Sequence, residues 1–193
     1  GHEMSLLDRL SPGTQAESMM ETQNLAEAAA SARTRVFTWA DPASMLAHAP
    51  GRTGRQLLEA MAAGEIPAPP VASMVDFATF DVVDDTVVVT MRPQEFHYNP
   101  LGTVHGGVIA TLLDTVAGCA VQLTLAEGQG YTSLDLDTKF VRPVTVASGT
   151  VRAVGRVVHR GQRVAHAAAS LTDERGKVLA TARSSCVELG AAV

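Results

Sequence analysis

The chain has 193 residues, 46% of them hydrophobic and 18% charged, a composition typical of a globular domain with a substantial core. The formal net charge is −5, and Lys and Arg form no stripe interleaved with aromatic residues, so we expect no nucleic acid partner. No apolar run approaches the roughly 18 residues of a membrane span, so we expect no membrane partner either.

Residues 1–70 have helical composition and few strong β signals. Ala and Met are frequent in residues 18–32 and again in residues 42–63. Gly64 and the prolines of residues 67–70 then stop any helix. We predict that residues 1–70 form a helical, partly ordered N-terminal extension.

Residues 71–190 read as one domain of a different texture. Residues 105–125 are apolar on nearly all sides and hold no proline, which predicts a long buried helix. The segments before and after it are β-rich, and short turns make neighbouring strands antiparallel. The predicted strands are residues 71–83, 86–92, 131–141, 147–158, 163–172 and 178–189. This order predicts an α+β hotdog fold, an antiparallel sheet wrapped around a long central helix.

The sharpest motif, Asn-Pro-Leu-Gly-Thr-Val-His-Gly-Gly, runs from Asn99 to Gly107 into the start of that helix. Glycines there let a ligand approach bare backbone closely. The first N–H groups of a helix have no internal partner and point outward with the positive end of the helix dipole. Because a carbonyl oxygen gains negative charge when its carbon is attacked, such a helix start is suited to be an oxyanion hole. Glycines alone would equally suit a structural helix entry.

Asp114 lies inside the predicted helix, between Leu113 and Val116. A carboxylate buried among apolar side chains is costly, so we favour a functional role over a hydrogen bond to a neighbouring loop. At 1.5 Å per residue, Asp114 lies about 12 Å beyond Gly106 along the helix. One substrate carbonyl cannot touch both Gly106 and Asp114 within a single chain. If both act on one substrate, the site lies between two subunits and a homodimer is the minimum active unit.

The segment of residues 97–114 resembles the signature of the phenylacetate-degradation-type (PaaI-like) hotdog thioesterases. The resemblance continues through residues 131–136, 140–143, 157–163 and 171–180. It implies an enzyme that hydrolyses an acyl-CoA thioester to the free acid and CoA. No cofactor is implied, because CoA is part of the substrate. A homodimer is implied as well, and tetramers built as pairs of dimers are common among such proteins.

The resemblance also implies roles for individual residues of the motif. Asn99 would hold or polarise the thioester, or position water. Gly106 would donate its backbone N–H to the oxyanion, and His105 would support that turn. Asp114, from the partner subunit, would be either the nucleophile or the general base for water, and both remain open.

A hydroxyl on the strand after the helix would assist the carboxylate. The match favours Ser133, while Thr132 has the other strand parity and is the weaker candidate. Some relatives carry a hydroxyl on the helix one turn after the carboxylate, but Gly118 occupies that place here. Because the helix lacks that hydroxyl, Ser133 becomes the favoured residue to assist the carboxylate.

Arginine residues and glycines are the candidates for binding the CoA part of the substrate. Arg160, Gly161 and Arg163 form a tight turn with two guanidinium groups, which suit phosphates. Arg142 and Gly107 are further candidates. For each arginine, a solvated surface charge is an equal alternative.

Cysteine and histidine usage indicates a reducing compartment and no metal site. Cys119 and Cys186 lie in apolar segments far apart in sequence, as buried free thiols do, which favours a cytoplasmic location. The six histidines show no ligand spacing, and the chain has no CxxC or HExxH motif.

Two other functions were weighed against thioester hydrolysis. A hydratase/dehydratase on this fold carries Asp-x-Asn-Pro-x-His, whereas residues 97–102 read His-Tyr-Asn-Pro-Leu-Gly and lack both catalytic members. A hotdog dimer that binds acyl-CoA without turnover is the remaining alternative, and its binding would be indifferent to Asp114→Ala. The sequence favours neither medium-chain nor aromatic acyl groups. It also leaves open whether the extension caps the pocket or covers a subunit interface.

Overall fold

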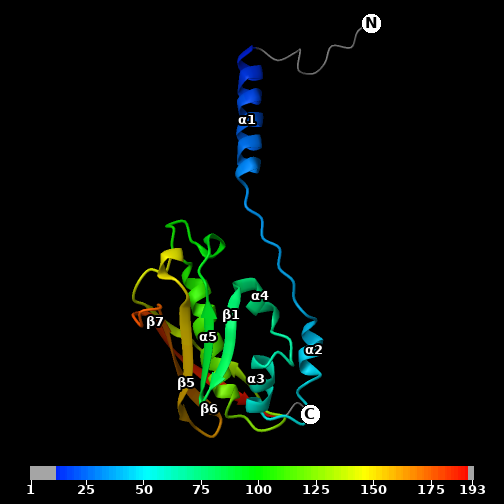
Figure 1. Cartoon of the computed structure of the whole chain (residues 1–193), viewed down its shortest axis with the longest axis vertical. Helices are drawn as coiled ribbons and strands as arrows, with labels where there is room; N and C mark the ends of the chain where they lie inside the picture. The colour runs from blue at the N-terminus through cyan, green and yellow to red at the C-terminus, as the bar shows by residue number, and fades with distance from the viewer. Residues whose placement is uncertain (1–11, 191–193) are drawn as a thin grey trace. The chain divides into compact units, whose positions relative to one another are not determined.

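A computed structural model describes residues 12–190, and the chain divides between Val36 and Phe37 into two compact units. The described part of the first unit holds helix α1 (Pro12–Ser31) and an extended segment after it. The second unit, Phe37–Val193, holds the other elements (Figure 1). The predicted extension thus contributes to both units, its residues 1–11 lie outside the described part, and its boundary near residue 70 stays a prediction.

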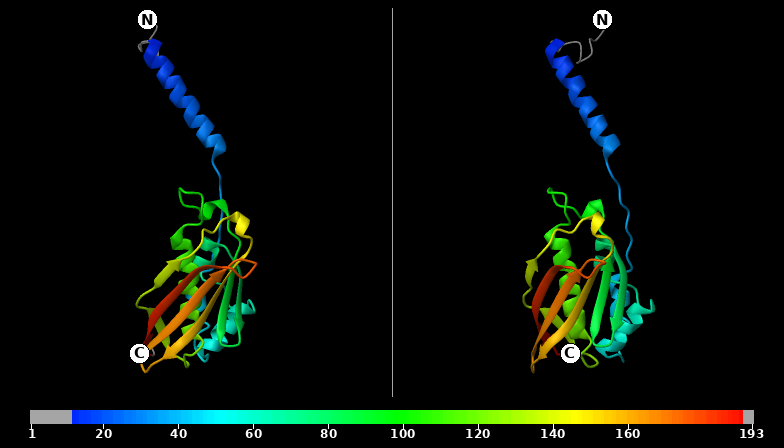
Figure 2. Two further views of the ribbon diagram at one scale, coloured as in Figure 1. Left: turned by 90° about the vertical axis from the view of Figure 1, so that its left-hand side faces the viewer. Right: turned by 60° about the vertical axis from the view of Figure 1, so that its left-hand side comes forward.

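The second unit is an antiparallel sheet with a long helix against its concave face. The helices and short helical turns are α2 (Pro42–Leu46), α3 (Gly54–Ala62), α4 (Pro70–Val75), η2 (Glu95–His97), α5 (Gly106–Gln122) and η3 (Val146–Ser148). The strands are β1 (Phe77–Val83), β2 (Thr86–Met91), β3 (Gly130–Ser133), β4 (Asp137–Phe140), β5 (Val151–Arg160), β6 (Val164–Thr172) and β7 (Val178–Leu189). Their order is β1-β2-β5-β6-β7-β3, with β4 beside β7. Figure 2 shows the sheet curving around α5, which confirms the predicted hotdog fold.

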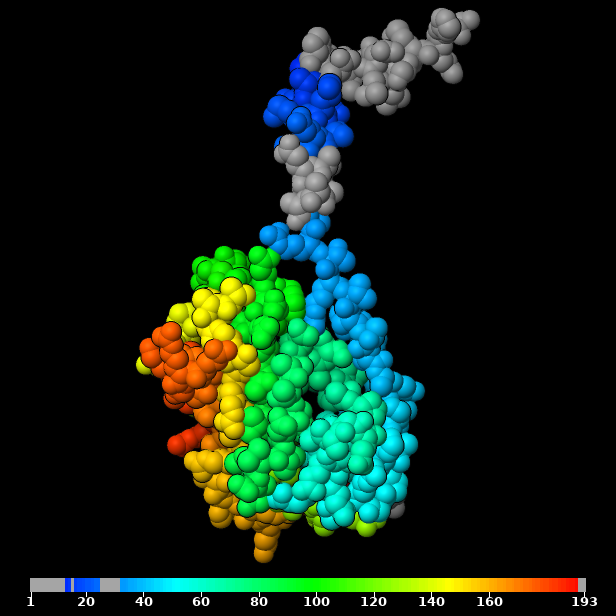
Figure 3. Space-filling view, in the orientation of Figure 1, coloured from blue at the N-terminus to red at the C-terminus, as the bar shows by residue number. Residues whose placement is uncertain are grey.

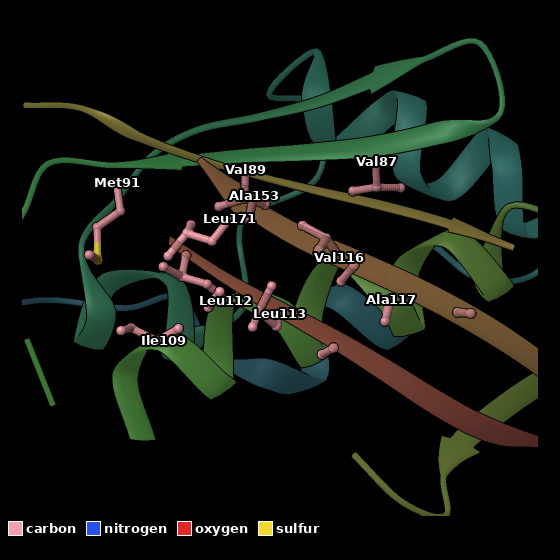
Figure 4. Close-up of a cluster of buried hydrophobic side chains, with 14 of the residues drawn as sticks. Val87, Val89, Met91, Ile109, Leu112, Leu113, Val116, Ala117, Ala153 and Leu171 are labelled. Atoms are coloured by element: carbon pink, nitrogen blue, oxygen red, sulfur yellow. The ribbon is translucent and has the colours of Figure 1, made fainter. Parts of the chain in front are cut away.

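The core forms where α5 presses on the sheet. Leu112, Leu113 and Val116 are fully buried against the inner faces of β2, β5 and β6 (Figure 4). Gly155 on β5 allows the closest approach, because a Cβ there would lie 2.0 Å from the carbonyl oxygen of Val116. A side chain at that position would therefore push the helix off the sheet. The apolar pattern that predicted a buried helix is confirmed.

Two predicted strands begin later along the chain than predicted. The segment predicted as one strand over residues 71–83 begins as helix α4, because Pro70 fixes a helical φ at the first turn. Asp76, in the left-handed conformation, ends α4 and turns the chain into β1. The strand predicted to start at residue 147 begins only at Val151, after the turn η3 and Gly149, which has a φ of 67°.

The strand predicted over residues 131–141 is broken into β3 and β4. The break is at Asp135, whose carboxylate accepts a hydrogen bond from the backbone N–H of Ser185 at 2.8 Å. The hydroxyl of Ser184 donates to the Asp135 carbonyl oxygen at 2.8 Å. These bonds from β7 replace the regular strand ladder and make an interrupted edge to the sheet.

Candidate active site

Five residues of the predicted site line two separate hollows on the second unit. Asn99, Gly106 and Arg142 line one of them, which we call the amide hollow. Asp114 and Ser133 line the other, which we call the carboxylate hollow. Within one chain, the structure therefore does not bring Gly106 and Asp114 to a common point.

The loop before α5 is held by the side chain of Asn99. Its Oδ1 accepts from the N–H groups of Leu101 at 2.9 Å and Thr103 at 3.3 Å, and its Nδ2 donates to the Thr103 hydroxyl at 3.0 Å. The amide nitrogen has two hydrogens, so one remains for the hollow. Gly102 takes a φ of 78° in this loop, which favours glycine. The primary contacts of Asn99 are therefore with its own loop.

Helix α5 begins with a cap that leaves one backbone amide open. His105 is the N-cap, and its Nδ1 accepts from the N–H of Gly107 at 2.9 Å. The N–H of Gly106 finds no acceptor among residues 12–190. A Cβ on Gly106 would lie 3.0 Å from the ring of Phe140, so the ring covers this glycine closely. The Gly106 amide is thus available to a ligand, whereas the Gly107 amide is used within the cap.

The carboxylate hollow is organised by one hydrogen bond. The hydroxyl of Ser133 donates to Oδ1 of Asp114 at 3.0 Å. Ser133 pairs with the buried Cys186 of β7, so its side chain is on the helix side of the sheet, while Thr132 alternates to the other side. The predicted burial of Asp114 is wrong for the single chain: the side chain is half-buried, because the sheet edge beside it is interrupted.

Tyr131 fills the space that Gly118 leaves on α5. A Cβ on Gly118 would lie 2.5 Å from the Tyr131 hydroxyl. That hydroxyl also hydrogen-bonds to Cys119. Burial raises the pKa of the Cys119 thiol to about 12, the bond from Tyr131 opposes the rise, and the charge of Asp114 adds to it. Burial likewise raises the pKa of Tyr131. A tyrosine hydroxyl from β3 therefore stands where a helix side chain would otherwise project.

The arginines predicted to bind CoA lie at opposite ends of α5. Arg142 lines the amide hollow and donates to the carbonyl oxygen of Val178. Arg160 instead donates to the hydroxyl of Thr124, beyond the C-terminal end of α5, and forms an ion pair with Glu188 at 2.6 Å. A helix of this length spans about 25 Å. The two arginines of one chain are thus not brought together.

The remaining residues of the predicted CoA turn have simpler surroundings. Gly161 donates its N–H to the carbonyl oxygen of Val164 at 2.9 Å and closes the turn between β5 and β6. The side chain of Arg163 is exposed. Between residues 12 and 190, no group of three or more His, Cys, Asp or Glu side chains is arranged to hold a metal ion. In the same range, no helix is both long and apolar enough to cross a bilayer.

Two residues of the site received no role from the sequence. Tyr131 shares its strand parity with Ser133, a signal that was available, but its packing against Gly118 depends on how β3 meets α5. Phe140 covers Gly106 from a strand that pairs with β7, and no local pattern indicates that contact.

Comparison with known proteins finds relatives that are named as thioesterases. The family model of the thioesterase superfamily matches residues 101–180. Acyl-coenzyme A thioesterase 13 of Mus musculus is 30% identical over 100 residues, which are 51% of this chain and 70% of the mouse protein. The proofreading thioesterase EntH of Cronobacter sakazakii is 31% identical over 107 residues, 55% of this chain and 77% of that protein.

Solved structures extend the likeness to the fold. A phenylacetic acid degradation-related protein from Ralstonia eutropha JMP134 has a TM-score of 0.61 and 30% identity, covering 67% of this chain and 98% of its own. A Bacillus halodurans protein solved with CoA has a TM-score of 0.58 and 29% identity, covering 63% of this chain and 80% of that one. The resemblance to phenylacetate-degradation-type hotdog thioesterases is confirmed, and the chain belongs to the thioesterase superfamily of enzymes.

Proposed function

We propose that this protein hydrolyses acyl-CoA thioesters at sites shared by two copies of the chain. The observation that carries the proposal is the Asp114 carboxylate, held by the Ser133 hydroxyl in a surface hollow of a thioesterase fold. The open N–H of Gly106 at the start of the same helix supports it. Curated relatives named acyl-coenzyme A thioesterase, and a relative solved with CoA, support the substrate class.

In the proposed reaction, the thioester oxygen accepts a hydrogen bond from the Gly106 N–H of one subunit. Asp114 of the partner subunit either attacks the carbonyl carbon or removes a proton from the water that attacks it. The C–S bond breaks, the electron pair leaves with sulfur, and CoA departs as the thiol after taking a proton from Asp114, if it acted as the base, or from solvent. If Asp114 is the nucleophile, water then hydrolyses the acyl-aspartyl anhydride, which releases the free acid and restores the carboxylate. The backbone amide lowers the barrier by stabilising charge as it develops on oxygen.

The arrangement of apolar surface supports the homodimer. Leu134 beside the carboxylate hollow is 60% exposed, and Phe140 over Gly106 is 57% exposed. Strands β3 and β4 form an edge of the sheet in this chain. An open edge with exposed large apolar residues is a typical protein interface. Pairing there would also bury Asp114 further; assembly of dimers into tetramers is a second step of the proposal.

The test is a thiol-release assay over acetyl-, hexanoyl-, decanoyl-, palmitoyl-, benzoyl- and phenylacetyl-CoA. Asp114→Asn keeps the shape of the side chain and should lower kcat at least a hundredfold with little change in KM. Asp81→Asn is the matched control, because Asp81 is exposed on β1, at the opposite edge of the sheet from β3 and β4. Equal kcat for Asp114→Asn and wild type would remove Asp114 from the mechanism.

An acyl-CoA-binding protein without turnover is the alternative outcome. It predicts no thiol release from any ester, while CoA esters still bind and Asp114→Ala leaves their affinity unchanged. For an active enzyme, a single turnover in H₂¹⁸O tests the nucleophilic role of Asp114. Label in the Asp114 carboxylate identifies a nucleophile, because only water attack on the aspartyl carbon of a mixed anhydride places it there.

We also propose a cytoplasmic, reducing environment for the protein. Cys119 and Cys186 are both free thiols, and Cys186 is fully buried. Two free thiols in a chain of this size are typical of compartments that keep cysteines reduced. Fractionation of the source cells tests the location, and recovery outside the cytoplasm would contradict it.

A further inference from the structure

An apolar cavity of about 500 Å³ lies between the helices that precede the sheet, strand β1 and helix α5. Met45, Ala49 and Leu57 wall it on the helical side, and Phe77 and Phe80 on the β1 side. None of the described residues that line it is charged. Figure 3 shows the hollow between the cyan residues of α2 and α3 and the green residues of β1. It is distinct from the amide and carboxylate hollows.

We propose that this cavity binds the acyl chain of the substrate and that the preferred substrates carry linear aliphatic acyl groups of medium length or longer. The inference rests on the proposed thioesterase activity and names its substrate class. Most of the walls come from residues 45–80, which lie before the segment of residues 101–180 that matches the thioesterase superfamily. The cavity is therefore walled largely by residues that lie outside that segment.

The helical wall is fixed to the rest of the unit. The N–H of Gly54 donates to the carbonyl oxygen of Leu125 at 3.0 Å, and a Cβ on Gly54 would lie 1.8 Å from the carbonyl oxygen of Gln122. Arg55 forms an ion pair with Asp85, in the turn between β1 and β2, at 2.6 Å. Helix α3 is thus in backbone contact with the C-terminal end of α5. Its apolar side, with Leu57, Leu58 and Met61, lines the cavity.

One end of the cavity lies beside the carboxylate. Thr115, the residue after Asp114 on α5, lines the cavity, as do Cys119 and Tyr131. Tyr131 and Ser133 are alternate residues of β3, so their side chains share one face, and Ser133 contacts Asp114. An acyl chain in the cavity would therefore end where its thioester meets Asp114.

The chemistry of the walls selects the acyl class. An uncharged apolar lining disfavours phosphates and free carboxylates, because their charges would lose contact with water. The binding free energy becomes more favourable with each methylene that moves from water into the cavity. A benzoyl group would occupy only a small part of about 500 Å³, whereas a long flexible chain can follow the space. Each added methylene should raise kcat/KM about fourfold until the cavity is full.

The experiment measures kcat/KM for acetyl-, hexanoyl-, decanoyl- and palmitoyl-CoA with wild type, Ala49→Phe and Ala47→Phe. Ala49 lines the cavity, whereas Ala47 is exposed at the end of α2 and serves as the matched control. We expect Ala49→Phe to lower the decanoyl value at least tenfold and leave the acetyl value unchanged. If Ala49→Phe fails to fold, Met61→Trp fills the same space from α3. A chain-length profile identical in wild type and the filling variant overturns the proposal.

Calorimetric binding of decanol separates this inference from the proposed reaction, because it needs no turnover and brings no carboxylate close to Asp114. Decanol that binds wild type and the Ala47→Phe control, but at least tenfold more weakly to Ala49→Phe, supports the acyl site even if no ester is hydrolysed. Decanol that does not bind wild type, or binds Ala49→Phe equally well, overturns the acyl site even if esters are hydrolysed.

Discussion

Gly155→Ala should disturb both the amide hollow and the carboxylate hollow, although Gly155 lines neither of them. The added Cβ would lie 2.0 Å from the Val116 carbonyl oxygen and 2.8 Å from the Ala117 backbone nitrogen. Real Cβ atoms essentially never come within 3.0 Å of such atoms, so helix and strand must separate by about 1 Å. Backbone atoms cannot rotate away as a side chain would, so the strain stays in the packing between α5 and the sheet.

Overpacking of this kind costs about 1–3 kcal/mol, and we take the upper end because the contact is with backbone. Alanine also lowers the conformational entropy of the unfolded chain, which stabilises the folded state by about 0.4–1 kcal/mol. The free energy of unfolding should therefore fall by roughly 2 kcal/mol in total. For a domain of this size, that loss lowers Tm by about 4–8 °C. Helix α5 carries both Gly106 and Asp114. A shift of about 1 Å should therefore also lower kcat/KM about a hundredfold.

Urea and thermal unfolding followed by circular dichroism, with thiol release measured below the transition, check both effects. Gly130→Ala is the control, since the atom nearest to its new Cβ is a Leu189 carbon at 4.0 Å. It should change the free energy of unfolding by less than about 0.5 kcal/mol. Wild-type unfolding and activity for Gly155→Ala would refute the close contact between α5 and β5.

Two further predictions concern Ser133 and Cys119. Ser133→Ala should lower kcat about tenfold with little change in KM, because it removes the hydrogen bond from the Ser133 hydroxyl that orients Asp114. Unchanged kcat at saturating decanoyl-CoA would count against this role. Burial raises the pKa of Cys119 to about 12, so its thiol stays protonated at pH 8 and should react with a disulfide reagent much more slowly in the native protein than after unfolding. Equal reaction rates of this thiol in native and unfolded protein at pH 8 would contradict the raised pKa.

The sequence predicted the parts of the site that depend on local chemistry. The glycines at Gly106 and Gly107 mark a helix start, and the apolar run around Asp114 marks a helix inside a sheet, because these signals act over a few residues. The eight-residue separation of Gly106 from Asp114 already indicated that the two residues of one chain do not act on the same carbonyl. They line separate hollows, the amide hollow and the carboxylate hollow. Periodicity and chain order together determined the hotdog fold.

Only the tertiary structure decided which distant segments meet. The strand break at Asp135 depends on hydrogen bonds from Ser184 and Ser185, about fifty residues further along the chain. Arg142 and Arg160 are apart because they lie at opposite ends of α5. The apolar cavity is bounded by helix α3, whose Gly54 contacts the C-terminal end of α5. No local pattern encodes such contacts, because each is the joint result of strand pairing and helix packing across the whole unit.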